Sequence, residues 1–433
     1  MKPILILVGC FFAIASFGQI APKDNKTNAP KTPTLKPIDV GNTTPTHPLH
    51  SQRQAAQKQN TQQNNITIQQ RNESKRRREE AERLIAESKQ KTIEYDFPSK
   101  AHLSATAPYQ AAYQEIVDML EGKQAMSLKR AVFVTENAFY DNQYKYEWHN
   151  LEIAENVELI KQSILQEGYS LENETARKWG IHQFMADTII LKNEQGKVID
   201  THYPLQYDFK DPFGEEDWQQ QFVTKLDISG KGQCHSLPLK YLILAEELEV
   251  EAWLAHSPSH TYIKLKDAKG NWLNYETTNG SYATDAWVQS SGFIKAEALR
   301  NRIYMDTLSK KEVIASQLLD LAQGYARKHG LDPFFSKCLE KTLEYAPKNI
   351  TALQLKADYE TYRVQYIIQQ LGFPPPEHLP SFPKAHKLHQ AMIQNYQKVE
   401  ASGYETMPEN IYTAWLKSFE QEKAKHPERI IRP

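Results

Sequence analysis

The sequence predicts an α+β protein, because helical patterns fill two long stretches and strand patterns fill the interval between them. Residues 95–186 and 306–425, the latter interrupted at Pro374–Pro376, carry apolar side chains three and four positions apart, which is typical of amphipathic helices. Residues 187–203 and 260–277 contain short runs separated by turn residues, and each predicts a strand pair. With 433 residues, 40% of them apolar, the chain can bury a sizeable core.

The first segment predicts export from the cytoplasm. Met1–Gly18 contains one lysine, a long apolar run and then small residues, as in a secretory signal peptide cleaved before Gln19. Leu7–Cys10 also resembles a bacterial lipobox, but the apolar run continues past Cys10, which argues against a lipid anchor. We therefore expect a periplasmic or secreted protein with no integral membrane span after signal removal.

Residues 19–94 predict a tether ahead of the folded part. Gln19–Asn72 is rich in Gln, Asn, Lys, Thr and Pro, so disorder is expected there. Glu73–Lys91 has mixed charges at helical spacing and predicts a solvated helix. The run Lys75–Arg78 could bind an anionic surface, although an exposed helix face is the favoured interpretation. A formal net charge of −1 requires no nucleic-acid partner.

The candidate chemistry lies between Gly230 and Thr278, and its first member is Cys234. Apolar residues follow Cys234 at helical spacing, and Pro238 is tolerated only in a first turn, so Cys234 is expected at a helix N-terminus. That end of a helix carries partial positive charge and N–H groups, which favour a thiolate and can form an oxyanion hole. The alternative is an inert, buried cysteine.

A histidine and a carboxylate follow at the ends of a predicted hairpin. His260 begins an alternating run, and Glu276 lies near the end of the run that starts at Trp272, after a turn at Asp267–Gly270. Antiparallel pairing can therefore bring the two side chains together. Asn274 lies on the same strand face as Glu276 and is the alternative partner for the imidazole. Thiol, imidazole and orienting carboxylate are the parts of a cysteine triad.

A zinc site is the competing interpretation of these residue types. His256 and His260 have the spacing of a metal-binding helical pair, but Pro258 lies between them and no glutamate follows His256. We therefore expect no metal and no cofactor. The three cysteines are also too few for a disulfide scaffold.

About fifty residues of this stretch resemble the transglutaminase-like superfamily, which has a papain-type fold. The shared features are Gly-x-Cys entering a helix, His-x-Tyr-Ile on a strand, and Trp-x-x-x-Glu-x-Thr on the next strand. The resemblance implies Cys234 as nucleophile, His260 as base and Glu276 in place of the usual aspartate. It also implies a strand at Trp253, after the cysteine helix. Thr277 departs from the proline of the family pattern, and the interval from cysteine to histidine is shorter.

The C-terminal third predicts helices with a partial repeat. Residues 340–349 resemble the close of a tetratricopeptide repeat (TPR), with neighbouring helices expected at 318–328 and 351–362. No more than one and a half repeats are visible, whereas an independent solenoid needs about three. These helices could bind a protein partner or could only support the catalytic domain.

The sequence thus predicts a transglutaminase-like (papain-like) domain at 95–300 with N-terminal helices, followed by a TPR-like helical region at 301–433. The expected function is a cysteine-dependent amide hydrolase or acyl transferase acting on a peptide or protein substrate. The alternative is a non-catalytic binding or scaffold protein that retains the fold and engages a partner through the helical repeats.

Overall fold

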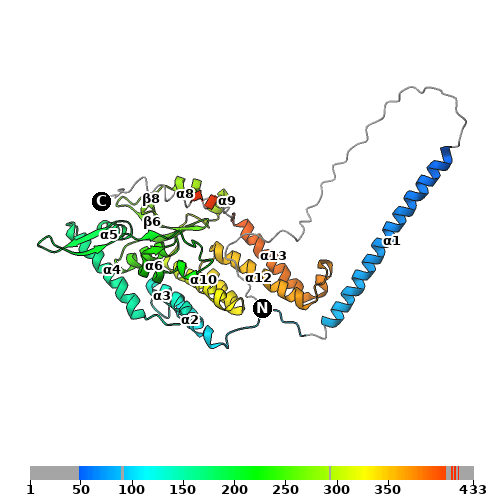
Figure 1. Cartoon of the computed structure of the whole chain (residues 1–433), viewed down its shortest axis with the longest axis horizontal. Helices are drawn as coiled ribbons and strands as arrows, with labels where there is room; N and C mark the ends of the chain where they lie inside the picture. Colours follow the sequence, from blue (N-terminus) through cyan, green and yellow to red (C-terminus); the bar gives the residue numbers. More distant parts are fainter. Residues whose placement is uncertain are drawn as a thin grey trace, which may run out of the picture. The chain divides into compact units, whose positions relative to one another are not determined.

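A helix-rich chain with small sheets appears in the computed structural model, so the predicted α+β class is confirmed (Figure 1). The structure describes residues 48–88, 92–291, 294–405, 411–412, 414–415 and 418. The chain divides into two compact units. The first contains residues 93–370 and those from 383 onward, and the second contains helix α1 (Pro48–Ser88) and residues 371–382.

Helices form the N-terminal part of the first unit, as the apolar spacing predicts. Side-chain caps start two of them, because Ser127 accepts the Arg130 N–H before α3 and Asn173 accepts the Thr175 N–H before α5. The elements are η1 (Ser104–Thr106), α2 (Ala107–Leu120), α3 (Leu128–Phe139), α4 (Tyr146–Gln166) and α5 (Glu174–Ala186).

The largest described sheet has four antiparallel strands in the order β5-β6-β7-β8. The strands are β5 (Trp253–Ser257), β6 (His260–Lys266), β7 (Trp272–Glu276) and β8 (Ser281–Ala283). The pairing of β6 with β7 is the hairpin predicted for residues 260–277. Two short pairs precede this sheet, namely β1 (Ile189–Lys192) with β2 (Val198–His202), and β3 (Gln206–Tyr207) with β4 (Lys231–Gly232).

Helix α7 (Ser236–Glu247) lies at the centre of the first unit. It contacts helices α3, α4 and α5 as well as strands β5 and β6. Leu237, Tyr241 and Leu244 on this helix have no exposed surface. Since burying one such side chain stabilises a fold by roughly 1.5–3 kcal/mol, α7 is firmly anchored. The residues at its N-terminal end are fixed with it.

The two faces of the sheet contribute to different clusters. Ile263 and Leu265 on β6 join the main core with α7, whereas Tyr262 joins a smaller cluster with Ala255 and Val288. Successive residues of a strand point to opposite faces. His260 therefore shares the face of Tyr262.

The C-terminal helices of the first unit share its main core. Buried residues of α10 (Lys310–His329), including Ile314 and Leu318, belong to the same apolar cluster as α2 and α3. The boundary expected near residue 300 is therefore not a break between compact units. The described helices after the sheet are α8 (Asp285–Ser291), α9 (Ala296–Arg300), α10 (Lys310–His329), α11 (Pro333–Tyr345), α12 (Ile350–Gln370) and α13 (Pro383–Ala401).

The second unit contains the long helix α1 (Pro48–Ser88). The expectation of disorder through Asn72 is wrong for residues 48–72, which belong to this helix. The reason is composition, because the helix has no glycine, has proline only at its first residue, and is rich in Gln, Arg and Glu, all good helix formers. Residues 19–47 lie outside the described part of the chain.

The basic run of α1 is a paired, solvent-exposed helix face. Lys75 pairs with Glu79 at 3.7 Å and Arg78 with Glu82 at 3.4 Å, each one turn apart. The sequence favoured an exposed helix face over binding to an anionic surface. Such exposed pairs contribute at most about 0.5 kcal/mol each.

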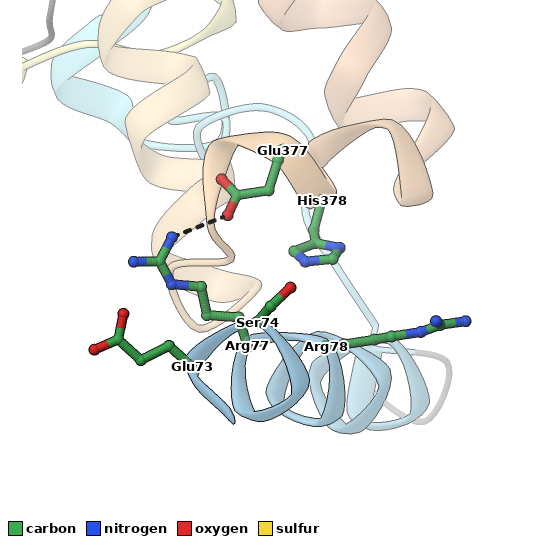
Figure 2. Close-up of a pocket in the computed structure, with 6 residues that line it drawn as sticks. All are labelled: Glu73, Ser74, Arg77, Arg78, Glu377 and His378. Carbon is green, nitrogen blue, oxygen red and sulfur yellow. Dashed lines mark ion pairs between the residues drawn. The ribbon is translucent and has the colours of Figure 1, made fainter. Parts of the chain in front are cut away.

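A shallow pocket of about 420 Å³ lies within the second unit. Figure 2 shows its wall, in which Arg77 reaches toward Glu377 of η3 (Pro376–Ser381) at 3.6 Å. Its lining residues are Glu73, Ser74, Arg77, Arg78, Glu377 and His378. The pocket combines both charge signs and includes none of the expected catalytic residues.

The predicted signal segment, residues 1–18 with Cys10, lies outside the described residues. Among the helices that the structure describes, none has both the length and the apolar character that crossing a membrane requires.

Candidate active site

Two helices and a tight connection deliver Cys234 to its place. Helix α6 (Val223–Ser229) ends at Gly230, whose φ of 65° is left-handed and suits glycine. A Cβ on Gly232 would lie 2.7 Å from the Ser236 hydroxyl oxygen, so this close approach also requires glycine. The Ser236 hydroxyl accepts the Gln233 N–H at 3.0 Å. The residues on both sides of Cys234 are thereby held in one conformation.

A buried ion pair ties these two helices together. Lys240 Nζ on α7 lies 2.6 Å from Asp227 Oδ1 on α6, and the two side chains are 1% and 7% exposed. A buried pair of this kind is costly to break, because the remaining charge has no compensation. The connection that carries Cys234 is therefore fixed at both ends.

Cys234 directly precedes α7, as the sequence predicts. His235 is the N-cap residue of the helix, and Pro238 lies in its first turn. The Cys234 side chain is half-buried, and its sulfur lies 3.9 Å from the carbonyl oxygen of Ser259 in the turn between β5 and β6. The other described free thiol, Cys338 on α11, is fully buried, and burial raises its pKa. Of the two, only Cys234 is open to chemistry.

His260 and Glu276 come together across the β6–β7 pair. The His260 Nε2 lies 2.6 Å from Glu276 Oε2, and the two side chains are 2% and 1% exposed. Extending the strand register by one step from Ile263 and Tyr275 puts Glu276 opposite Tyr262. It is then a diagonal neighbour of His260 on the same face, within reach of a long side chain.

The charge of this pair favours a protonated imidazole. Burial alone would lower the pKa of His260, but the Glu276 carboxylate and the Cys234 thiol both raise it, so that it lies above its ordinary value. Because Nε2 is engaged by Glu276, Nδ1 is the ring nitrogen that can exchange a proton with the thiol.

Asn274, the alternative orienting residue, is engaged elsewhere. Its amide donates to Asp285 Oδ1 at 2.7 Å and to the Ala283 carbonyl at 3.3 Å. The register pairs Asn274 with Lys264, four residues from His260. Lys264 and His260 are roughly 13 Å apart along the strand. Asn274 shares the strand face of Glu276 but lies too far from His260 to hold its imidazole.

Two further imidazoles, those of His235 and His256, lie near the triad. His235 Nε2 lies 3.1 Å from Asp320 Oδ2 on α10. His256 on β5 contacts the Thr261 hydroxyl at 3.4 Å, and burial together with the charges of His235 and His260 lowers its pKa to about 4. Among the described residues, no group of three or more His, Cys, Asp or Glu side chains has metal-binding geometry.

Aromatic side chains from the C-terminal segment cover the imidazole. The ring of Trp415 lies 4.8 Å from that of His260, edge to face. Tyr412, which is 4% exposed, packs against Phe213 at 4.6 Å and Trp415 at 5.7 Å. Nothing in the sequence indicated this contact, because 155 positions separate Trp415 from His260. Access to the site from this side is therefore restricted.

No family model, curated protein or solved structure matches the chain. The likeness to transglutaminase-like enzymes therefore depends on the quoted residues.

Proposed function

We propose that this protein is an exported cysteine-dependent amide hydrolase or acyl transferase acting on peptide-like substrates. The observation that carries the proposal is the 2.6 Å contact between His260 and Glu276 beside a half-buried thiol at a helix N-terminus. A thiol, an imidazole and an orienting carboxylate in this order are what nucleophilic cysteine catalysis requires. Export is inferred from residues 1–18.

The proposed reaction starts from a thiolate–imidazolium pair. The Cys234 sulfur attacks the amide carbonyl carbon, and the carbonyl oxygen becomes an oxyanion next to the N-terminal N–H groups of α7. As the C–N bond breaks, His260 gives its proton to the leaving amine and a thioester remains. Water or a second amine then attacks the thioester, and His260 takes up a proton from the attacking group. The C–S bond breaks, which releases the Cys234 thiolate. Water yields a carboxylic acid, and an amine yields a new amide.

The order of elements agrees with a transglutaminase-like domain. A helix carries the cysteine, and two successive strands carry the histidine and the carboxylate. We further propose that α10, α11 and α12 are the TPR-like region. They pack consecutively, but α10 also packs on α2 and α3, which favours a supporting role over a free binding surface.

One observation favours the second candidate, a non-catalytic binding protein with this fold. Trp415 covers His260, and Tyr412 is buried beside it. A site closed in this way needs an opening step before a substrate can reach the imidazole. A scaffold needs no such step.

Iodoacetamide labelling of the folded protein across pH separates the two candidates. Labelled residues are mapped by mass spectrometry, with Cys234→Ala as the blank, His260→Ala as the test and buried Cys338 as the internal control. An enzyme labels at Cys234 below about pH 7, and His260→Ala moves the profile toward an ordinary thiol near pH 8.5. A parent protein that already follows the ordinary profile contradicts the enzyme proposal.

A further inference from the structure

A second histidine–carboxylate pair adjoins Cys234 and has no part in the proposed triad. His235 follows Cys234 directly and is held by Asp320 at 3.1 Å. The same Asp320 oxygen accepts the amide of Gln317 at 3.2 Å, and Gln317 is 2% exposed. Gln317, one turn before Asp320 on α10, thus holds the carboxylate, which in turn holds the imidazole.

The pair keeps His235 charged at neutral pH. Burial lowers the pKa of His235, but Asp320 first and Cys234 next raise it more strongly, to about 8. Glu136 on α3 adds to the increase. The imidazole of His256, which interacts with His235, stays neutral because its pKa is lowered to about 4.

We propose that His235, held by Asp320, is a positioning residue that keeps a second positive charge beside Cys234 and stabilises its thiolate. This inference rests on the proposed function. Charge is what matters, because the imidazole already donates to Asp320 and need not touch a substrate. Two cations beside one sulfur lower the energy of the thiolate more than His260 alone can.

The pH window follows from the raised pKa of His235. Below about pH 8 the imidazole is charged and supports the thiolate, and above that pH the support is lost as the proton leaves. The groups that set this window are Asp320, Cys234 and Glu136, which favour the charged form. His256, on β5, interacts with His235 but remains uncharged.

The test is the pH profile of Cys234 alkylation by iodoacetamide in the full chain. His235→Gln removes the charge and should move the profile up by about one pH unit, so that labelling in mild acid slows about tenfold. His235→Lys keeps a cation and should restore the parent profile to within a few tenths of a unit. His102→Gln, an exposed imidazole of the same unit, is the matched control and should change nothing.

The outcomes separate this inference from the proposed function. If the parent labels like an ordinary thiol, the proposed function fails. If the parent labels in mild acid and His260→Ala abolishes this, but His235→Gln leaves the profile in place, only this inference is overturned. An equal shift in His235→Gln and His235→Lys also overturns it, because the effect is then structural.

A measurement on the unmutated protein guards against a variant that fails to fold. Carbon-13 NMR of the histidine rings, with His235→Gln used only to identify the signal, reports the protonation of His235. We expect a charged ring at about pH 7, given the pKa of about 8. A neutral ring at that pH overturns the inference.

Discussion

Replacing Glu276 with glutamine should return the proton of His260 to the Cys234 sulfur. The carboxylate lies 2.6 Å from Nε2 and both side chains are buried, so little water screens the pair. Unit charges about 4 Å apart interact by about 4 kcal/mol at an effective dielectric constant of 20, and desolvation offsets part of this. A net loss of roughly 1.5–3 kcal/mol remains for a hydrogen bond to a charged group.

That loss lowers the pKa of His260 by roughly 1–2 units. The thiolate–imidazolium pair becomes a neutral thiol and imidazole over part of the pH range, and alkylation of Cys234 in mild acid should slow at least tenfold. Asn274→Ala is the matched control, because Asn274 shares the strand face and contacts Asp285 instead. A shift with Asn274→Ala and none with Glu276→Gln would refute the assignment of Glu276.

The same substitution has a signature in stability. Because the folded-state pKa of His260 is raised, the pair stabilises the fold fully below the unfolded value of about 6.5, and this contribution is lost as pH rises through the folded value. Urea unfolding should therefore show Glu276→Gln to be destabilised at about pH 6.5, with a smaller difference at higher pH. A difference that grows with pH would contradict this sign.

Three other predictions concern the surroundings of the site. Trp415→Ala should speed alkylation of Cys234 a few-fold at fixed pH, because it uncovers His260. Trp148→Ala, at an exposed position, should leave the rate unchanged. Equal alkylation rates in Trp415→Ala and the parent would contradict a covering role. Lys240→Met should lower the free energy of unfolding by about 3–5 kcal/mol, measured in urea, because Asp227 is left charged and buried; a loss below about 1 kcal/mol would show that the pair is dispensable. Burial raises the pKa of Glu136 to about 7, so the parent should lose stability as pH rises from about 4.5 to 7, and Glu136→Gln should flatten that dependence in thermal unfolding.

The sequence predicted the elements of the site more fully than its surroundings. Helical spacing after Cys234 and the hairpin turn at Asp267–Gly270 are local signals, and both elements appear where they were expected. Local spacing also restricted the orienting residue to Glu276 or Asn274. Deciding between them required the strand register, which depends on pairing and not on a single segment.

The contacts at the site that the sequence did not indicate are long-range. Asp320 reaches His235 from α10, and Trp415 reaches His260 from the C-terminal segment. Neither contact leaves a periodic or compositional trace in one sequence. The length of α1 was underestimated for another reason, because a polar composition that cannot form a core can still form a helix.

The most direct test of the central claim is the ultraviolet absorbance of the Cys234 thiolate, taken as the difference between the parent protein and Cys234→Ser across pH. A thiolate–imidazolium pair predicts thiolate absorbance already at about pH 6, and its loss at that pH in His260→Ala. Thiolate absorbance that rises only near pH 8.5 in the parent and in His260→Ala alike would contradict the claim, since Cys234 would then be an ordinary thiol.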